Sequence, residues 1–199
     1  MKKMFAALIV LVITTTVSAQ EKRWEHNIYT GVGLFVEDYG YGNETGLSSK
    51  IGYGLNYHIN EKLSVMLGIA WRGLMTGIFR SGEVGSQIDD FEYIDIPVIV
   101  QWHGIAKNKK WILGLGPVFS FCVSGSEYYI DHDPKHPLNG LNVAKKFNFG
   151  MQPSIMYKMG KWRIGLEGNI GLMNVRDGHG ITTGTIRLHD IMATGKFCF

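Results

Sequence analysis

Apolar and polar residues alternate along most of the chain. Between Leu47 and Ile59, every second residue is apolar or aromatic with one exception, and the residues between them are small or polar. An alternation with a period of two predicts a β-strand whose two faces meet different surroundings. The pattern predicts eight such strands, at or near residues 28–36, 47–59, 63–72, 93–102, 111–122, 147–158, 162–172 and in a last segment that ends at 199.

The predicted connections alternate in length. Those at 60–61, 105–110 and 159–160 are short, whereas those at 37–45, 76–90, 125–143 and 174–184 are longer. Short turns at one end and long loops at the other are typical of up-and-down barrels in bacterial outer membranes. We therefore expect an all-β fold, an eight-stranded antiparallel up-and-down transmembrane β-barrel. Both termini would lie in the periplasm and the long loops outside the cell.

The apolar face of the predicted strands is rich in aromatic residues. Trp102, Trp111 and Trp162 flank the short turns, and Trp71 lies toward the other end of its strand. Tryptophan is enriched at the two interfaces of a membrane, where it forms an aromatic girdle. A soluble ligand-binding barrel would instead direct its apolar face inward, around the ligand. The girdle favours an apolar face that meets outer-membrane lipid.

Both ends of the chain carry features of export. Residues 1–19 combine a basic start, an apolar run and the small residues of Val17-Ser18-Ala19, which predicts a cleaved signal peptide. A retained anchor is the weaker alternative, because the apolar run is shorter than the roughly 20 residues of a spanning helix. Residues 20–199 would form the barrel domain. Phe197 and Phe199 at the end of the last strand resemble the signal that the outer-membrane assembly machinery recognises.

Several segments resemble one family of outer-membrane proteins. Tyr93–Val100 is similar to the aromatic-x-acidic-Ile-Pro-apolar strand of PorT-like outer-membrane β-barrel proteins of Bacteroidetes. Gly114–Pro117, Gln152–Ser154 and the mature start at Gln20 are also similar to that family. The resemblance covers essentially the whole mature chain. It implies an outer-membrane barrel, usually without an assigned activity, and some relatives act in protein export.

Three prolines, Pro97, Pro117 and Pro153, lie inside predicted strands. Proline removes a donor from the hydrogen-bond ladder, and a closed barrel has no free edge where that loss is harmless. A bulge is the usual accommodation. A simple bulge would shift the alternation, which continues in phase through Pro97.

Charge and cysteine content narrow the functions further. The chain has 20 Lys and Arg against 17 Asp and Glu, and loss of Lys2 and Lys3 with the signal peptide leaves 18 − 17 = +1. A near-neutral chain lacks the basic surface that nucleic-acid binding requires. Cys122 and Cys198 lie on strands that are not neighbours in the predicted order, so we expect both to stay unpaired.

The inward face of the predicted barrel carries many polar residues. Charges in a narrow barrel are stable only when paired, so we expect a polar network that fills the lumen. Its members would be Lys50, Arg72, Asp95, Gln152, Arg163 and Glu167, with Gln101, Asn169 and Lys196. Eight strands enclose a space just wide enough for side chains, which predicts no general diffusion pore. A path for protons or small ions is the alternative.

One loop contains candidate metal ligands. Asp131, His132, Asp133 and His136 could bind a divalent ion such as Zn²⁺. Their spacing matches no known site signature, so we expect a solvated loop without a metal and a protein without a cofactor.

A second group of residues could serve a lipid-modifying enzyme. Its members are His179, His189, Asp190, Ser124 and Ser126, near the long loops. No spacing links them as nucleophile, base and orienting group, so we expect no enzyme.

These patterns predict a non-enzymatic barrel that acts through extracellular loops or as a structural envelope protein. A partner-binding component of an envelope protein export or assembly machine is the alternative, and a lipid-modifying enzyme comes third. The expected partners are outer-membrane lipid, the assembly machinery and an unidentified envelope protein.

Overall fold

The computed structural model describes residues 23–38, 43–76, 86–105, 110–130, 141–142, 145–175 and 186–199. Their elements are β1 (Trp24–Asp38), β2 (Asn43–His58), β3 (Leu63–Met75), β4 (Ser86–Ile105), β5 (Trp111–Leu115), β6 (Pro117–Ile130), β7 (Leu141–Asn142), β8 (Phe147–Met151), β9 (Ser154–Met159), β10 (Trp162–Gly171) and β11 (Arg187–Cys198). Within these segments, no helix has the length and apolar character to cross a membrane.

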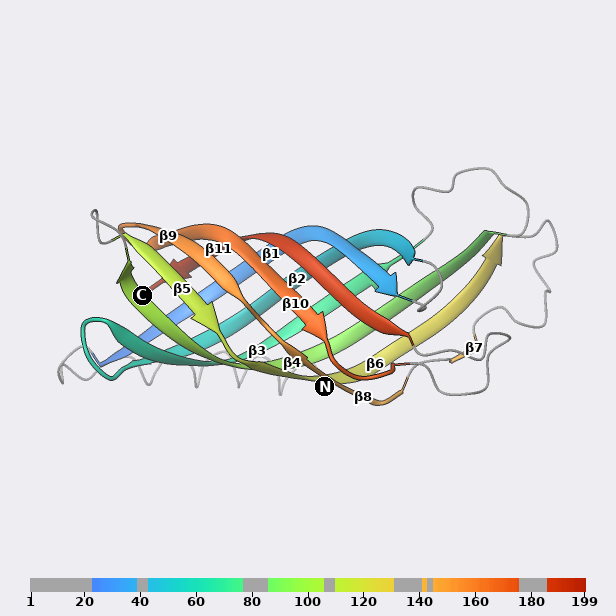
Figure 1. The fold of residues 1–199 in the computed structure, drawn as a ribbon, viewed down its shortest axis with the longest axis horizontal. Helices are drawn as coiled ribbons and strands as arrows, with labels where there is room; N and C mark the ends of the chain where they lie inside the picture. Colours follow the sequence, from blue (N-terminus) through green and yellow to red (C-terminus); the bar gives the residue numbers. More distant parts are fainter. Residues whose placement is uncertain are drawn as a thin grey trace, which may run out of the picture.

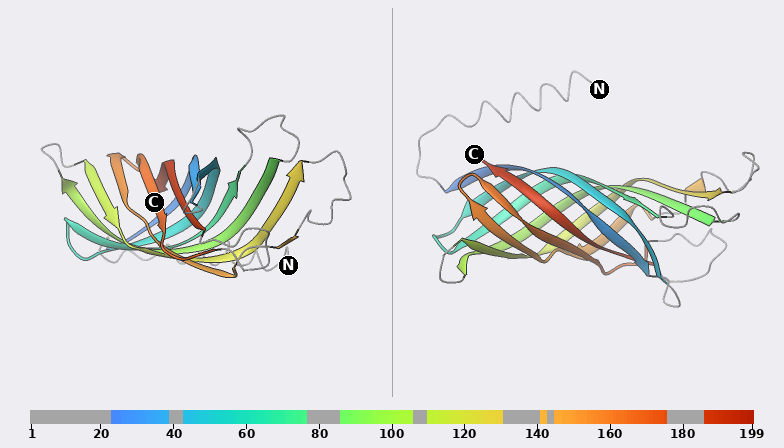
Figure 2. Two further views of the ribbon diagram at one scale, coloured as in Figure 1. Left: turned by 45° about the vertical axis from the view of Figure 1, so that its right-hand side comes forward. Right: turned by 90° about the horizontal axis from the view of Figure 1, so that it is seen from above.

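All strand pairs are antiparallel, and the sheet closes on itself. The order runs β11-β1-β2-β3-β4-β5-β9-β10, and β10 pairs again with β11. β6 continues the line of β5, and β8 that of β9, so the wall of the barrel follows the eight predicted strands (Figures 1 and 2). The expected all-β antiparallel fold class is confirmed.

The two ends of the barrel differ. We call the end with the connections between β2 and β3, β4 and β5, and β9 and β10 the turn end. The opposite end, where β1 connects to β2, β3 to β4, β6 to β8 and β10 to β11, is the loop end. β1 begins and β11 finishes at the turn end, which lies on the left in Figure 1.

Several strands are longer than the alternation predicted. β1 covers Trp24–Asp38, β4 already begins at Ser86, and β6 continues to Ile130. Backbone pairing continues from Asp90↔Ser126 to Ser86↔Ile130, beyond the last pair of β3 with β4, Met75↔Asp90. Ladder hydrogen bonds join backbone groups, so they persist where the apolar–polar alternation fades. The connection after β1 shortens accordingly, to residues 39–42.

The prolines are accommodated in two ways. Around Pro97 the pairs Leu67↔Val98 and Ala70↔Asp95 keep one register, so the ladder skips the proline without a bulge. Gly68 leaves room for the ring, since a Cβ there would lie 3.0 Å from the Pro97 Cγ.

Near Pro117 and Pro153 the predicted continuous strands are interrupted. The fifth predicted strand divides into β5 and β6, and the sixth into β8 and β9. Backbone bonds still bridge the breaks, because Gln152 N donates to Gly116 O at 2.8 Å and Gly168 N donates to Pro153 O at 2.9 Å.

Side chains alternate between the two faces as predicted. On β3, Met66 faces inward and is 1% exposed, whereas its neighbour Leu67 faces outward and is 54% exposed. The same contrast separates Lys50, 4% exposed, from Ile51, 56% exposed. An outer face of exposed apolar side chains and a buried polar interior are the reverse of a water-soluble core.

Candidate functional site

Arg72 of β3 is the centre of one polar cluster in the lumen. Its Nε donates to Asp95 Oδ2 at 2.7 Å, and its Nη1 donates to Asp190 Oδ2 at 2.8 Å. Its Nη2 lies 3.3 Å from the Ser120 hydroxyl, and the guanidinium is 5.1 Å from the centre of the Tyr93 ring. Since these partners come from β4, β6 and β11, Arg72 connects opposite walls of the barrel. A fully buried cation with two carboxylates satisfies its charge inside the protein.

Glu167 of β10 is the centre of a second cluster. It forms ion pairs with Lys196 at 2.8 Å and with Lys50 at 3.3 Å, and it accepts a 2.7 Å hydrogen bond from Gln152. Lys196 also lies over the ring of Tyr29, with 5.0 Å between the ammonium and the ring centre. Two cations around one carboxylate leave a local positive charge that the amide of Gln152 and the aromatic face help to disperse.

Arg163 forms a third cluster, nearer the turn end. It is paired with Glu25 of β1, and its Nη1 lies 3.5 Å from Gln101 Oε1. Glu25 also accepts a 2.9 Å hydrogen bond from the Asn56 amide. The six core members of the predicted network therefore lie in these three clusters, all buried.

Two charged members of the clusters, Asp190 and Glu25, are not in the predicted network. The sequence pattern places Asp190 only among the possible catalytic residues and assigns no role to Glu25. Both occupy inward positions of their strands, so the same alternation that selected Arg72 and Arg163 could have identified their partners.

Toward the loop end, the lumen contains an apolar cluster that the sequence did not predict, beside the buried polar residues Glu37 and Thr76. Its buried cluster consists of Phe35, Leu74, Phe91, Tyr93, Val175, Ile186 and Leu188. The Phe91 and Tyr93 rings stack with 6.5 Å between their centres, and Tyr93 in turn contacts Arg72. Buried polar side chains therefore occupy the middle and the turn end of the lumen, and toward the loop end an apolar cluster joins them.

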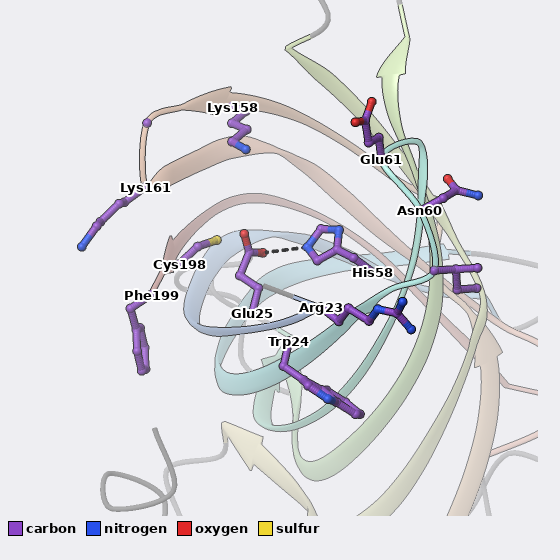
Figure 3. Close-up of a pocket in the computed structure, with 12 residues that line it drawn as sticks. Arg23, Trp24, Glu25, His58, Asn60, Glu61, Lys158, Lys161, Cys198 and Phe199 are labelled. Atoms are coloured by element: carbon purple, nitrogen blue, oxygen red, sulfur yellow. Dashed lines mark ion pairs between the residues drawn. The ribbon is translucent and has the colours of Figure 1, made fainter. Parts of the chain in front are cut away.

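A cavity of about 550 Å³ opens at the turn end of the lumen. Figure 3 shows Glu25, His58 and Cys198 around its mouth, with the Glu25–His58 ion pair at 4.0 Å. Lys158 is directed toward this mouth, whereas Lys161 is directed away from it. Glu25, which is paired with Arg163, thus also lines this cavity.

Aromatic side chains surround the outer face at the turn end. The ring pairs are Trp24–Tyr57 at 4.7 Å, Trp111–Tyr157 at 5.1 Å and Trp162–Phe197 at 5.0 Å. Trp102 is exposed on the same face, and Trp24 joins the residues named from the sequence. Trp71 lies on the outer face of β3, farther from the turn end. Phe199 completes the seam of the barrel, because its backbone exchanges hydrogen bonds of 2.9 and 3.1 Å with His26.

The other candidate residues are not brought together. Asp131, His132, Asp133, His136 and His179 lie outside the described residues, as does the side chain of Ser126. His189 and Asp190 are successive strand residues, so they face opposite sides of the wall. In the part of the chain that the structure describes, no group of three or more His, Cys, Asp or Glu could hold a metal ion.

The two cysteines are both free. Cys198 is buried on β11 and Cys122 is half-buried on β6, and these strands are not paired. Cys122 donates from its thiol to the Ser124 carbonyl at 3.3 Å. The expectation of two unpaired thiols is confirmed.

Comparisons with known proteins agree with this geometry. A family model described as "Outer membrane protein beta-barrel domain" matches residues 18–177. The fold is similar to Neisserial surface protein A (NspA), with a TM-score of 0.57 and 14% identity over 87% of this chain and 97% of that one. It is also similar to Ail, the attachment invasion locus protein of Yersinia pestis, with a TM-score of 0.52 and 12% identity over 88% of this chain and 98% of that one. No curated protein matches the chain in sequence.

Proposed function

Because the chain belongs to the outer membrane β-barrel domain family, we propose that it is a non-enzymatic envelope protein that acts at its loop end. The filled lumen supports this proposal most directly. Three ion-pair clusters and one apolar cluster occupy the interior, so the protein meets other molecules at its wall and its two ends. A barrel whose wall faces lipid has its ends available for partners in water.

The loop end offers an extended strand ladder for such contacts. β4 and β6 continue as a ladder beyond the last pair of β3, and β7 adds to β6 through Ser126↔Asn142 and Glu127↔Leu141. The name of Ail describes that protein as an attachment protein, and attachment to a partner surface is the kind of role that we propose here.

The proposal includes an orientation, with the turn end in the periplasm. Short turns face the periplasm in outer-membrane barrels. An epitope inserted between residues 131 and 140 should bind antibody on intact cells, and an epitope inserted between residues 107 and 109 should bind only after the outer membrane is permeabilised. The opposite result would refute the orientation. Mass analysis of the same preparation should give a chain that starts at Gln20.

A partner-binding role in envelope protein export or assembly is the second candidate. It rests on the similarity of Tyr93–Val100, Gly114–Pro117 and Gln152–Ser154 to PorT-like proteins. Crosslinking of intact cells separates the two candidates. An envelope protein captured from the periplasmic side favours export, whereas capture only at the loop end favours attachment. Outer-membrane lipid and the assembly machinery, which would recognise Phe197 and Phe199, are the partners proposed for both candidates.

A further inference from the structure

Each tryptophan at the turn end has a basic residue on its turn side. Arg23 precedes Trp24, Lys110 precedes Trp111, and Lys161 precedes Trp162 in the sequence. Trp102 has the same neighbour across the strands, because Leu63 pairs with Trp102 and the Lys62 carbonyl accepts a 2.7 Å bond from His103 N. Arg23, Lys62, Lys110 and Lys161 are all exposed. We call these four residues the basic collar.

Few acidic side chains are described at the turn end. Among the described residues at the turn end, the carboxylate side chains are Glu25 and Glu61, and Glu25 is paired with Arg163. The loop end differs in sign, since acidic Asp38, Glu44, Asp90 and Glu92 outnumber basic Lys145, Lys146 and Arg187 in the described segments. A nearly neutral chain therefore has a positive turn end.

Two side chains of the basic collar lie toward the outside of the barrel. The Lys110 ammonium is 5.8 Å from the centre of the Tyr157 ring, which belongs to the outer aromatic surface. Lys161 extends away from the cavity mouth, on the side where Phe199 also points outward (Figure 3). These cations are therefore at the boundary where the wall leaves the membrane, next to the tryptophans that mark the interface.

We propose that the basic collar binds the phosphate groups of anionic phospholipid in the leaflet at the turn end. Indole rings settle at the level of the lipid carbonyls, and a cation one residue closer to water reaches the phosphates. A soluble anionic partner would need the cations but not their placement beside every tryptophan. The placement therefore favours lipid. The inference rests on the proposed function in two respects: the barrel lies in the outer membrane, and its turn end faces the periplasm. The leaflet in question is therefore the periplasmic one.

The test measures lipid selectivity of the folded full-length barrel in vesicles. Spin-labelled phosphatidylglycerol and spin-labelled phosphatidylcholine are compared in a phosphatidylcholine host, and the ratio of their association constants is determined. Basic residues near an anionic surface contribute roughly fivefold each. We expect a preference of several-fold for phosphatidylglycerol that weakens at high salt.

Matched variants locate the preference. Lys62→Gln, Lys110→Gln and Lys161→Gln together should remove most of it and leave only the part that Arg23 contributes. The control Lys145→Gln, Lys146→Gln and Arg187→Gln removes the same charge from the loop end and should leave it unchanged. Heat-modifiable gel mobility verifies that both variants are folded, since all six positions are at the surface of the barrel.

Three results would overturn the inference. They are no preference in the unmodified protein, an equal loss in the two variants, and binding of soluble peptidoglycan fragments by the basic collar without lipid selectivity. The vesicle measurement does not depend on cellular orientation. Lipid selectivity together with a periplasmic loop end would therefore refute the proposed orientation and the leaflet, but not the binding of anionic lipid by the basic collar.

Discussion

On β3, Arg72 is the side chain with the most polar contacts inside the lumen. It bonds to Asp95 and Asp190, and both carboxylates are as deeply buried as the guanidinium. Burial of three charges is tolerated because each is paired and bonded, and removal of one leaves the others without compensation. The complete cluster therefore links the strands without a large loss of stability. Removal of one member destabilises the fold.

Replacement of Arg72 tests this coupling. Arg72→Met should lower the free energy of unfolding by about 3–5 kcal/mol, because two carboxylates would stay buried without a cation. Urea titration of the protein in lipid vesicles, followed by tryptophan fluorescence, measures the change. The triple variant with Asp95→Asn and Asp190→Asn should recover part of the loss. A loss below about 1 kcal/mol in the single variant would contradict the role of the pair.

At the scale of the strands, the alternation predicted which face each residue occupies but not where each strand ends. Lys50 and Arg72 could be assigned to the lumen because parity alone decides the face. The start of β4 at Ser86 could not be predicted in this way, because backbone hydrogen bonds form between strands whether or not apolar and polar residues alternate. Phe35, Phe91 and Leu188 follow the inward parity, yet their apolar character was not connected to one cluster, because the cluster joins strands far apart in the sequence.

The outward face of β3 gives a test of depth. Leu67→Arg should destabilise the barrel by about 2–4 kcal/mol, because its side chain faces lipid well inside the membrane. Leu63→Arg, at the turn-end start of the same strand, should cost about 0–1 kcal/mol. The same vesicle titration compares them. Equal costs would mean that the outer face of β3 does not cross a hydrocarbon layer.

The seam between β1 and β11 depends on one glycine. A Cβ on Gly33 would lie 1.9 Å from the Ile191 carbonyl oxygen, whereas a Cβ on Gly195 would meet nothing within 4 Å. Gly33→Ala should therefore cost about 1–3 kcal/mol, since the two strands must separate. Gly195→Ala, on the same seam, should change the stability by no more than about 0.5 kcal/mol. Comparable values for the two variants would show that the seam tolerates a wider spacing.

For the whole molecule, the outer face is apolar and the interior of the described barrel is packed with side chains, which leaves no open pore. In the described part of the chain, ion pairs cross the middle of the lumen, an apolar cluster lies toward the loop end, and a cavity opens at the turn end. A barrel of this strand number has no space for a water-filled channel once its side chains are packed.

Planar bilayer recordings test the closed interior. The reconstituted protein should give at most small and rare openings, because current would have to cross both the Arg72 cluster and the apolar cluster. Stable, large conductance steps in the purified protein would show that the interior rearranges in the membrane. Recordings with the Arg72→Met variant separate the two barriers, and a closed variant would assign the block to the apolar cluster.

Closure of the barrel also sets an order in time. Asn27 pairs with Cys198, at a separation of 198 − 27 = 171 residues, and contacts this remote in sequence form slowly. Asp190 and Lys196 both lie on β11, so Arg72 and Glu167 obtain these partners only when the last strand docks. The chain must therefore travel through the envelope with its future interior charges hydrated. The step that pairs β1 with β11 is therefore also the step in which the buried charges of the lumen obtain their last partners.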